Sequence, residues 1–182
     1  QGVKATNIDS LKSVLKQVSE KEKKAGILLS IGDAYGEKGD YTTALEHYKK
    51  AEILETRTEQ KTKIWYKTAS AESRLQRYKV ALQLCEDILE ASPSTKKLVA
   101  KTYSLMSNIK LSLGENDDAY ELQYEALKIS ESINDTVGLF FASYHIGTIY
   151  FYQSNYKLGL KHYKKALEYA KIHNYDYINA QT

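Results

Sequence analysis

The chain of 182 residues has little proline, glycine or cysteine, and each shortage excludes a class of protein. One proline and nine glycines are too few for the tight turns of a β-sandwich or β-barrel. The single cysteine, Cys85, cannot form an intramolecular disulfide, and no Cys/His spacing typical of a zinc site is present. The most apolar run, at 137–152, is too short to cross a bilayer. We therefore expect a soluble, mostly helical protein with no membrane insertion, metal or cofactor.

The net charge of +3 is small but unevenly distributed. Residues 61–113 contain ten basic and four acidic side chains, whereas residues 114–182 contain six basic and nine acidic ones. The small total argues against a nucleic-acid partner, and so do the more acidic flanks. The basic middle, with Trp65 and Tyr66 available for base stacking, keeps a nucleic-acid-binding solenoid open as an alternative.

Internal repeats account for most of the chain. Segments 29–54 and 144–169 align without a gap and share the motif HYKKA, at 47–51 and 162–166. Small residues mark the middle of four units at spacings of 37, 38 and 40: Ala44, Ala81, Ala119 and Gly159. Apolar residues recur at three- and four-residue intervals, which predicts two helices in each unit.

The predicted fold class is all-α, an α-α superhelix of about four helical hairpins in a single solenoid domain over residues 1–182. Turns are expected at Gly39-Asp40, Gln76-Arg77, Gly114-Glu115-Asn116 and Ser154-Asn155. The predicted parts are a capping helix at 8–18, repeats at 20–56, 58–91, 95–132 and 136–173, and the start of a truncated fifth unit at 176–182. The predicted helices are 8–18, 20–37, 41–56, 58–76, 78–91, 95–113, 116–132, 136–153 and 156–173.

These units resemble the tetratricopeptide repeat family. The first unit matches best through Leu28, Ile31-Gly32, Tyr35, Ala44, Tyr48 and Ala51, and the fourth through Ile146-Gly147, Tyr150, Gly159, Tyr163 and Ala166. The second unit departs from the family pattern at Glu72 and Cys85, and the third at Lys110 and Gln123. Each spacing exceeds the family's 34 residues, and such long units are similar to the repeat arrays of bacterial regulatory and sensor proteins.

The resemblance implies a non-enzymatic scaffold that binds a peptide or protein segment in a groove lined by the first helix of each hairpin. No phosphate-binding loop, GxSxG or HExxH motif is present, so we do not expect an enzyme. The predicted groove residues are Lys63, Tyr66, Lys67, Ser70, Arg74, Lys101, Asn108, Tyr144, His145 and Tyr152. Further inward positions are Leu29, Asp33, Ser104, Leu111, Phe141 and Thr148.

The expected ligand is acidic or ends in a free carboxylate, because basic and amide groups of the middle units accompany an aromatic wall from the last. The resemblance also suggests that the chain is the sensory or interaction module of a larger bacterial regulator. Segment 176–182 resembles the start of another first helix with no polar capping helix after it, so we expect the polypeptide to continue beyond residue 182. A structural module that self-associates through the edge at 176–182 is a further alternative. The sequence leaves a cytoplasmic or an exported location equally open.

Overall fold

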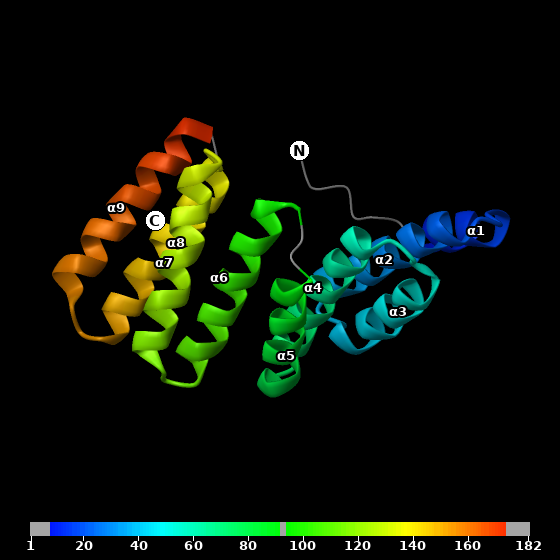
Figure 1. Ribbon diagram of the computed structural model, residues 1–182, viewed down its shortest axis with the longest axis horizontal. Coiled ribbons are helices and arrows are strands. Elements are labelled where there is room, and N and C mark those ends of the chain that lie inside the picture. The colour runs from blue at the N-terminus through cyan, green and yellow to red at the C-terminus, as the bar shows by residue number, and fades with distance from the viewer. Residues whose placement is uncertain (1–7, 92–93, 174–182) are drawn as a thin grey trace. The chain divides into compact units, whose positions relative to one another are not determined.

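The computed structural model describes residues 8–91 and 94–173, and these residues form helices joined by short turns, with no strand among them (Figure 1). The chain divides into two compact units, and the boundary lies between residues 93 and 94. Unit 1 contains α1 (Ile8–Gln17), α2 (Lys21–Glu37), α3 (Tyr41–Leu54), α4 (Thr58–Arg74) and α5 (Tyr78–Glu90). Unit 2 contains α6 (Lys96–Ser112), α7 (Asn116–Ser132), α8 (Thr136–Tyr152) and α9 (Tyr156–His173).

The prediction of hairpin repeats is confirmed. Each observed helix begins and ends within two residues of its predicted bounds, and the hairpins are α2/α3, α4/α5, α6/α7 and α8/α9. The predicted start of a further unit at 176–182 lies outside the described residues. The prediction of one continuous domain stays a prediction.

The four hairpin turns share one geometry. A single residue with positive φ follows the first helix of each hairpin: Gly39 (81°), Gln76 (60°), Gly114 (81°) and Ser154 (59°). The next N–H then bonds back to a carbonyl five residues earlier, as from Asp40 to Tyr35 at 3.0 Å. This left-handed cap satisfies carbonyls that the helix end leaves free, so the predicted breaks are confirmed.

Small residues allow the two helices of a hairpin to approach closely. A Cβ on Gly32 would lie 2.6 Å from a Tyr48 ring carbon, and one on Gly147 would lie 2.8 Å from the Tyr163 ring. In the third hairpin, the Ser107 hydroxyl donates to the Ala119 carbonyl at 2.6 Å. Side-chain bulk at these positions would separate the helices.

The N-terminal helix packs onto the first hairpin as predicted for a cap. Ile8 is buried with Ile31 and Ala34 of α2, and Leu11 and Leu15 lie against the same cluster. α1 therefore covers an apolar edge of the first repeat.

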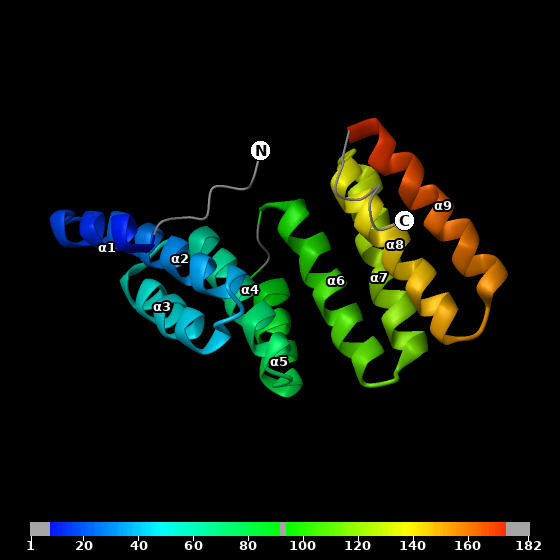
Figure 2. The ribbon, with the colours of Figure 1, turned by 180° about the vertical axis from the view of Figure 1, so that it is seen from behind.

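Unit 2 is organised around α8, which contacts α6, α7 and α9. α6 and α9 lie on opposite sides of the unit, with α7 and α8 between them (Figures 1 and 2). Leu139, Ala142 and Ile146 of α8 pack against Leu127 of α7, and Phe140 packs against Ala166 and Ala170 of α9. α8 thereby buries most of its circumference and leaves one stripe exposed.

Candidate functional site

Neighbouring first helices meet within each unit, α2 with α4 and α6 with α8. The predicted groove positions lie on these helices, one set in each unit. In unit 1 the Lys67 ammonium forms a 3.0 Å ion pair with Asp33 of α2. The Tyr48 hydroxyl donates to the other Asp33 oxygen at 2.8 Å. Asp33 thus links α2 to α4 and already forms an ion pair with Lys67.

The other predicted residues of unit 1 lie along α4. Lys63 and Ser70 are half-buried, and Arg74 is exposed at the helix end. Lys63 contacts the Gln60 side chain at 3.4 Å within the same helix. Leu29, from the inward positions of the first repeat, packs against the buried cluster of unit 1.

Tyr66 and Tyr144 occupy equivalent repeat positions but differ in exposure. Burial raises the pKa of Tyr66 to about 12, with a smaller contribution from the nearby Cys85. Tyr144 is 41% exposed, and its ring lies 5.5 Å from the Tyr163 ring. Cys85 and Tyr163 are themselves equivalent positions. Tyr66 is thus half-buried near the small Cys85, whereas Tyr144 is exposed beside the larger Tyr163.

The exposed stripe of α8 is an aromatic row. Phe141, Tyr144 and Tyr152 lie three and eight residues apart on one side of the helix and are 40%, 41% and 65% exposed. Thr148 lies between them and accepts a 3.2 Å hydrogen bond from the Tyr163 hydroxyl. We call Phe141, Tyr144 and Tyr152 the α8 aromatic row. Aromatic rings held on a rigid helix offer large contact areas at little entropic cost.

His145 lies beside this row rather than projecting from it. Its ring centre is 5.8 Å from that of Tyr144 and 6.3 Å from that of Phe141. Its Nδ1 is shielded from solvent without a hydrogen-bond partner among the described residues. Burial lowers the pKa of His145 to about 4, so the ring is neutral at pH 7.

α6 contributes the polar side of the unit 2 site. Lys101 is exposed, and Ser104, Asn108 and Leu111 are half-buried along the same helix. The Ser104 hydroxyl accepts a 3.0 Å hydrogen bond from Gln123 of α7. A cation, a hydroxyl and an amide therefore lie on the helix next to the α8 aromatic row, a combination that suits an anionic group beside an apolar one.

The sequence analysis did not predict two exposed aromatic residues of the last hairpin as site residues. Phe151 and Tyr156 are 54% and 60% exposed on either side of the Ser154 turn, with ring centres 5.3 Å apart. Phe151 lies seven residues after Tyr144 and so continues the exposed side of α8 to its end, and Tyr156 begins α9. Their closeness depends on the turn geometry, which periodicity does not reveal.

Part of the positive charge in the basic middle of the chain is paired with carboxylates. Arg77 pairs with Glu72 at 3.2 Å, Lys97 pairs with Asp135 at 3.0 Å, and Lys110 pairs with both Glu115 and Asp118. With Lys67, at least four of the ten basic residues of 61–113 form ion pairs with described residues. A continuous cationic stripe for a phosphate backbone is therefore weakened.

No group of His, Cys, Asp and Glu within residues 8–91 and 94–173 has an arrangement that could hold a metal ion. In that part of the chain no helix combines the length and apolar character that a membrane span requires.

Comparison with known proteins agrees with the geometry. Tetratricopeptide repeat models match residues 25–52 and 98–172, together more than half of the chain. No curated protein matches the sequence. The crystal structure of MamA has 24% identity and a TM-score of 0.64, with 92% of this chain and 88% of that chain covered.

Two further solved structures belong to larger chains. A Rap protein complexed with Competence and Sporulation Factor has a TM-score of 0.81 at 20% identity over 90% of this chain and 48% of that one. A signal transduction ATPase with a tetratricopeptide repeat sensor from Pyrococcus horikoshii has a TM-score of 0.77 at 20% identity, over 92% of this chain and 26% of that one. At these identities the structures show a shared fold. The chain belongs to the tetratricopeptide repeat family, and its repeats form a protein-interaction scaffold.

Proposed function

We propose that this protein is a non-catalytic module that binds an extended or helical peptide segment along the inner side of its first helices. The observation that carries the proposal is the α8 aromatic row. Three large rings exposed along one helix leave apolar surface in water, and a ligand side chain packed against them would remove it. Aromatic residues are also the commonest energetic centres of protein interfaces.

The ligand segment we propose carries an apolar or aromatic side chain next to an acidic group. The apolar part contacts Phe141 and Tyr144, and the acidic part lies toward Lys101 and Asn108 of α6. A charge-assisted hydrogen bond orients the anion, while the rings supply most of the contact area. Neutral His145 can take part in a hydrogen bond but contributes no charge at pH 7.

Unit 1 offers a second, more polar set of contacts. Lys63, Ser70 and Arg74 lie along α4, while Tyr66 is half-buried and Lys67 is held by Asp33. A ligand carboxylate would have to compete with Asp33 for Lys67. We therefore propose unit 2 as the peptide-binding part and assign unit 1 no more than a separate, weaker set of contacts.

We further propose that the chain is the sensory or interaction part of a larger bacterial regulator. The support is the fold shared with a Rap protein solved with Competence and Sporulation Factor and with the tetratricopeptide repeat sensor of a signal transduction ATPase. This chain covers less than half of each of those proteins. The regulatory role rests on that similarity of fold.

The test is selection of binding peptides from a random phage-displayed library against the full chain. Binding of the best selected peptide is then measured by calorimetry for the parent and for Tyr144→Ala and Tyr156→Ala variants. Both tyrosines are exposed on the last hairpin, but Tyr156 is not part of the α8 aromatic row. We expect Tyr144→Ala to weaken binding about tenfold or more and Tyr156→Ala to leave it nearly unchanged. Equal affinities for the two variants, or failure to select any peptide, would contradict the proposal.

A further inference from the structure

The outer faces of α7 and α9 carry opposite charges at equivalent positions. The third and fourth repeats are offset by 40 residues, which pairs each α7 position with an α9 position. The charge is reversed in five pairs: Asp117 with Lys157, Glu121 with Lys161, Glu125 with Lys165, Lys128 with Glu168, and Glu131 with Lys171. We call the first member of each pair, together with Tyr124, the α7 outer face, and the second members, together with Leu160, Lys164 and Ile172, the α9 outer face.

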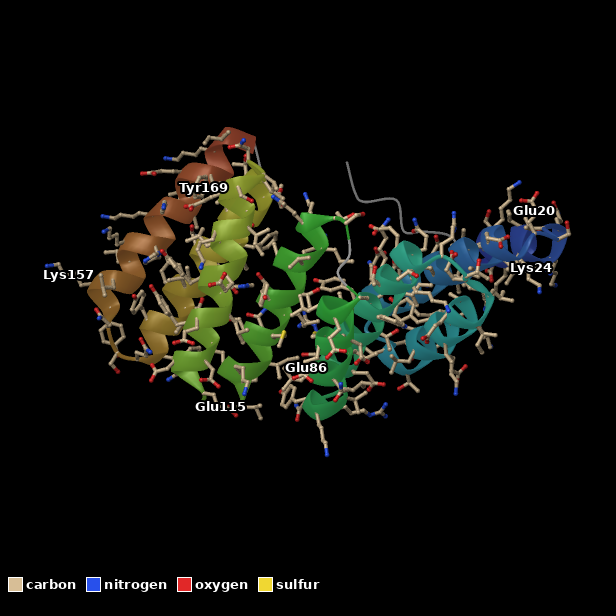
Figure 3. The ribbon with its side chains drawn as sticks, viewed as in Figure 1. Glu20, Lys24, Glu86, Glu115, Lys157 and Tyr169 are labelled. Carbon is tan, nitrogen blue, oxygen red and sulfur yellow. The ribbon has the colours of Figure 1, made fainter. Side chains whose placement is uncertain are left out.

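These charged residues lie at the surface. All of the paired residues are exposed except Glu125, which is half-buried with its side chain 46% exposed. Lys157 points away from the protein at the outer side of α9 (Figure 3). The exposed stripe of each helix therefore consists largely of charge, of one predominant sign on α7 and the other on α9.

The lysines of α9 contribute little to the stability of their own hairpin. None of the five lysines on α9 forms an ion pair with any residue in the described ranges 8–91 and 94–173. Lys157 is also the second residue of α9, where a cation is unfavourable beside the positive end of the helix dipole. In α7 the equivalent residue, Asp117, carries the negative charge that the positive end of the helix dipole favours. The lysines of this basic face are therefore not paired with described residues, and an anionic surface would complement them.

The α7 outer face has that anionic character together with room for an apolar side chain. Glu121 and Glu131 have no ion-pair partner in the described part of the chain, whereas Glu125 pairs with Lys128. A cavity of about 470 Å³ adjoins this face, lined among others by Met106 and Lys110 of α6 and by Glu121, Tyr124 and Glu125 of α7. On α9, Leu160 and Ile172 are 55% and 70% exposed among the lysines. The charges of the two faces are therefore complementary, and in equivalent positions Leu160 lies at the level of the cavity.

We propose that two copies of this chain associate through these faces, with α7 of each copy against α9 of the other. α7 and α9 are both second helices of successive hairpins that pack on α8, so they run in the same direction. A two-fold axis parallel to the helices then forms both contacts at once, which closes the assembly as a dimer.

The direction of packing follows from the charges. In parallel packing, opposite charges lie at the same level at all five pairs of positions. In antiparallel packing, Lys161 would approach Lys128 and Glu168 would approach Glu121, so two like-charge contacts would appear. The parallel arrangement is therefore favoured.

Charge reversal tests the proposal by sedimentation velocity of the full chain over protein concentrations up to about 1 mM, a range that reaches weak association. One variant carries Lys161→Glu and Lys165→Glu on α9, and a second carries Glu121→Lys and Glu125→Lys on α7. We expect each reversal to weaken dimerisation about a hundredfold, because like charges then face each other in both contacts. A mixture of the two variants should form heterodimers, because every contact between them is again between opposite charges.

The matched control is Lys49→Glu with Lys50→Glu, in the HYKKA motif of the first repeat. These exposed lysines belong to unit 1, so the same change in charge should leave the dimer intact. Circular dichroism confirms that each variant is folded. Salt should also weaken the dimer, since raising it from about 0.1 M to about 1 M shortens the screening length from about 10 Å to about 3 Å.

Three results would overturn the proposal. The parent chain could remain monomeric at the highest concentration, or a reversal could leave association unchanged, which would place the contact on another face. The folded variants could also fail to associate when mixed, which would show that the two faces do not meet.

Discussion

Adding a methyl group at two glycines of one helix should have opposite effects on stability. Gly26 and Gly32 both lie in α2, but nothing lies within 4 Å of a Cβ built on Gly26. A Cβ on Gly32 would instead contact the Tyr48 ring, with one ring carbon at 2.6 Å. The Tyr48 ring is 4% exposed, and its hydroxyl donates to Asp33, so it cannot move away without losing both packing and a hydrogen bond.

The expected changes in the free energy of unfolding follow from helix propensity at Gly26 and from propensity, overpacking and a lost hydrogen bond at Gly32. Replacing glycine by alanine in an open helical position favours the helix by about 1 kcal/mol, so Gly26→Ala should be stabilising by that amount. At Gly32 the same gain is opposed by overpacking, which costs about 1–3 kcal/mol, and by loss of a hydrogen bond worth about 1 kcal/mol. Gly32→Ala should therefore be destabilising by about 1–3 kcal/mol.

Urea denaturation followed by tryptophan fluorescence measures this difference in stability in unit 1, which contains both glycines. Trp65 is the only tryptophan, and its indole donates to Glu52 of α3 at 2.6 Å. Its emission therefore reports on the packing of α3 against α4. With an urea dependence of about 1–3 kcal/mol per molar, the two midpoints should differ by about 1 M or more. A Gly32→Ala variant as stable as Gly26→Ala would refute the argument that Tyr48 closes this position.

Three further predictions concern a turn and two titrating groups. Ser154→Gly should raise stability by about 1 kcal/mol in thermal melting, because Ser154 has a φ of 59° that glycine adopts without strain; an unchanged melting temperature would contradict this. Hydrogen bonds from the Arg57 side chain hold the pKa of Glu55 at about 2 against an ordinary 4.5, so this stabilisation is complete above pH 4.5 and lost as the pH falls toward 2. Glu55→Gln should flatten that acid dependence in urea titrations, and parallel curves would argue against it. The His145 ring should titrate by NMR near pH 4, and because the unfolded ring takes its proton near 6.5, stability should rise with pH between those values; a midpoint near 6.5 would show that the ring is not buried.

Local signals made the helical framework predictable from sequence. Gly39 and Gly114 mark two turns through their tolerance of positive φ, and the repeat alignment transfers the same turn to Gln76 and Ser154. Periodicity then fixes which residues face inward on each helix. These signals act over a few residues, so they require no knowledge of the tertiary structure.

The state of individual groove residues depends on contacts between distant segments. Periodicity placed Tyr66 and Tyr144 on equivalent inner positions, but Tyr66 is half-buried near Cys85 of another helix, whereas Tyr144 is exposed beside Tyr163. The pairing of Lys67 with Asp33 likewise joins residues of two different repeats. Sequence spacing identifies such positions, whereas packing decides which of them are available to a ligand.

The central claim is that the inner side of α6 and α8 binds peptide, and NMR mapping of backbone amide shifts tests it most directly. The selected peptide is added to the full isotope-labelled chain, and the shifts are followed residue by residue. The account predicts the largest changes along α8 from Phe141 to Tyr152 and along α6 from Lys101 to Asn108. Changes confined to the outer faces of α7 and α9, with α6 and α8 unaffected, would contradict it.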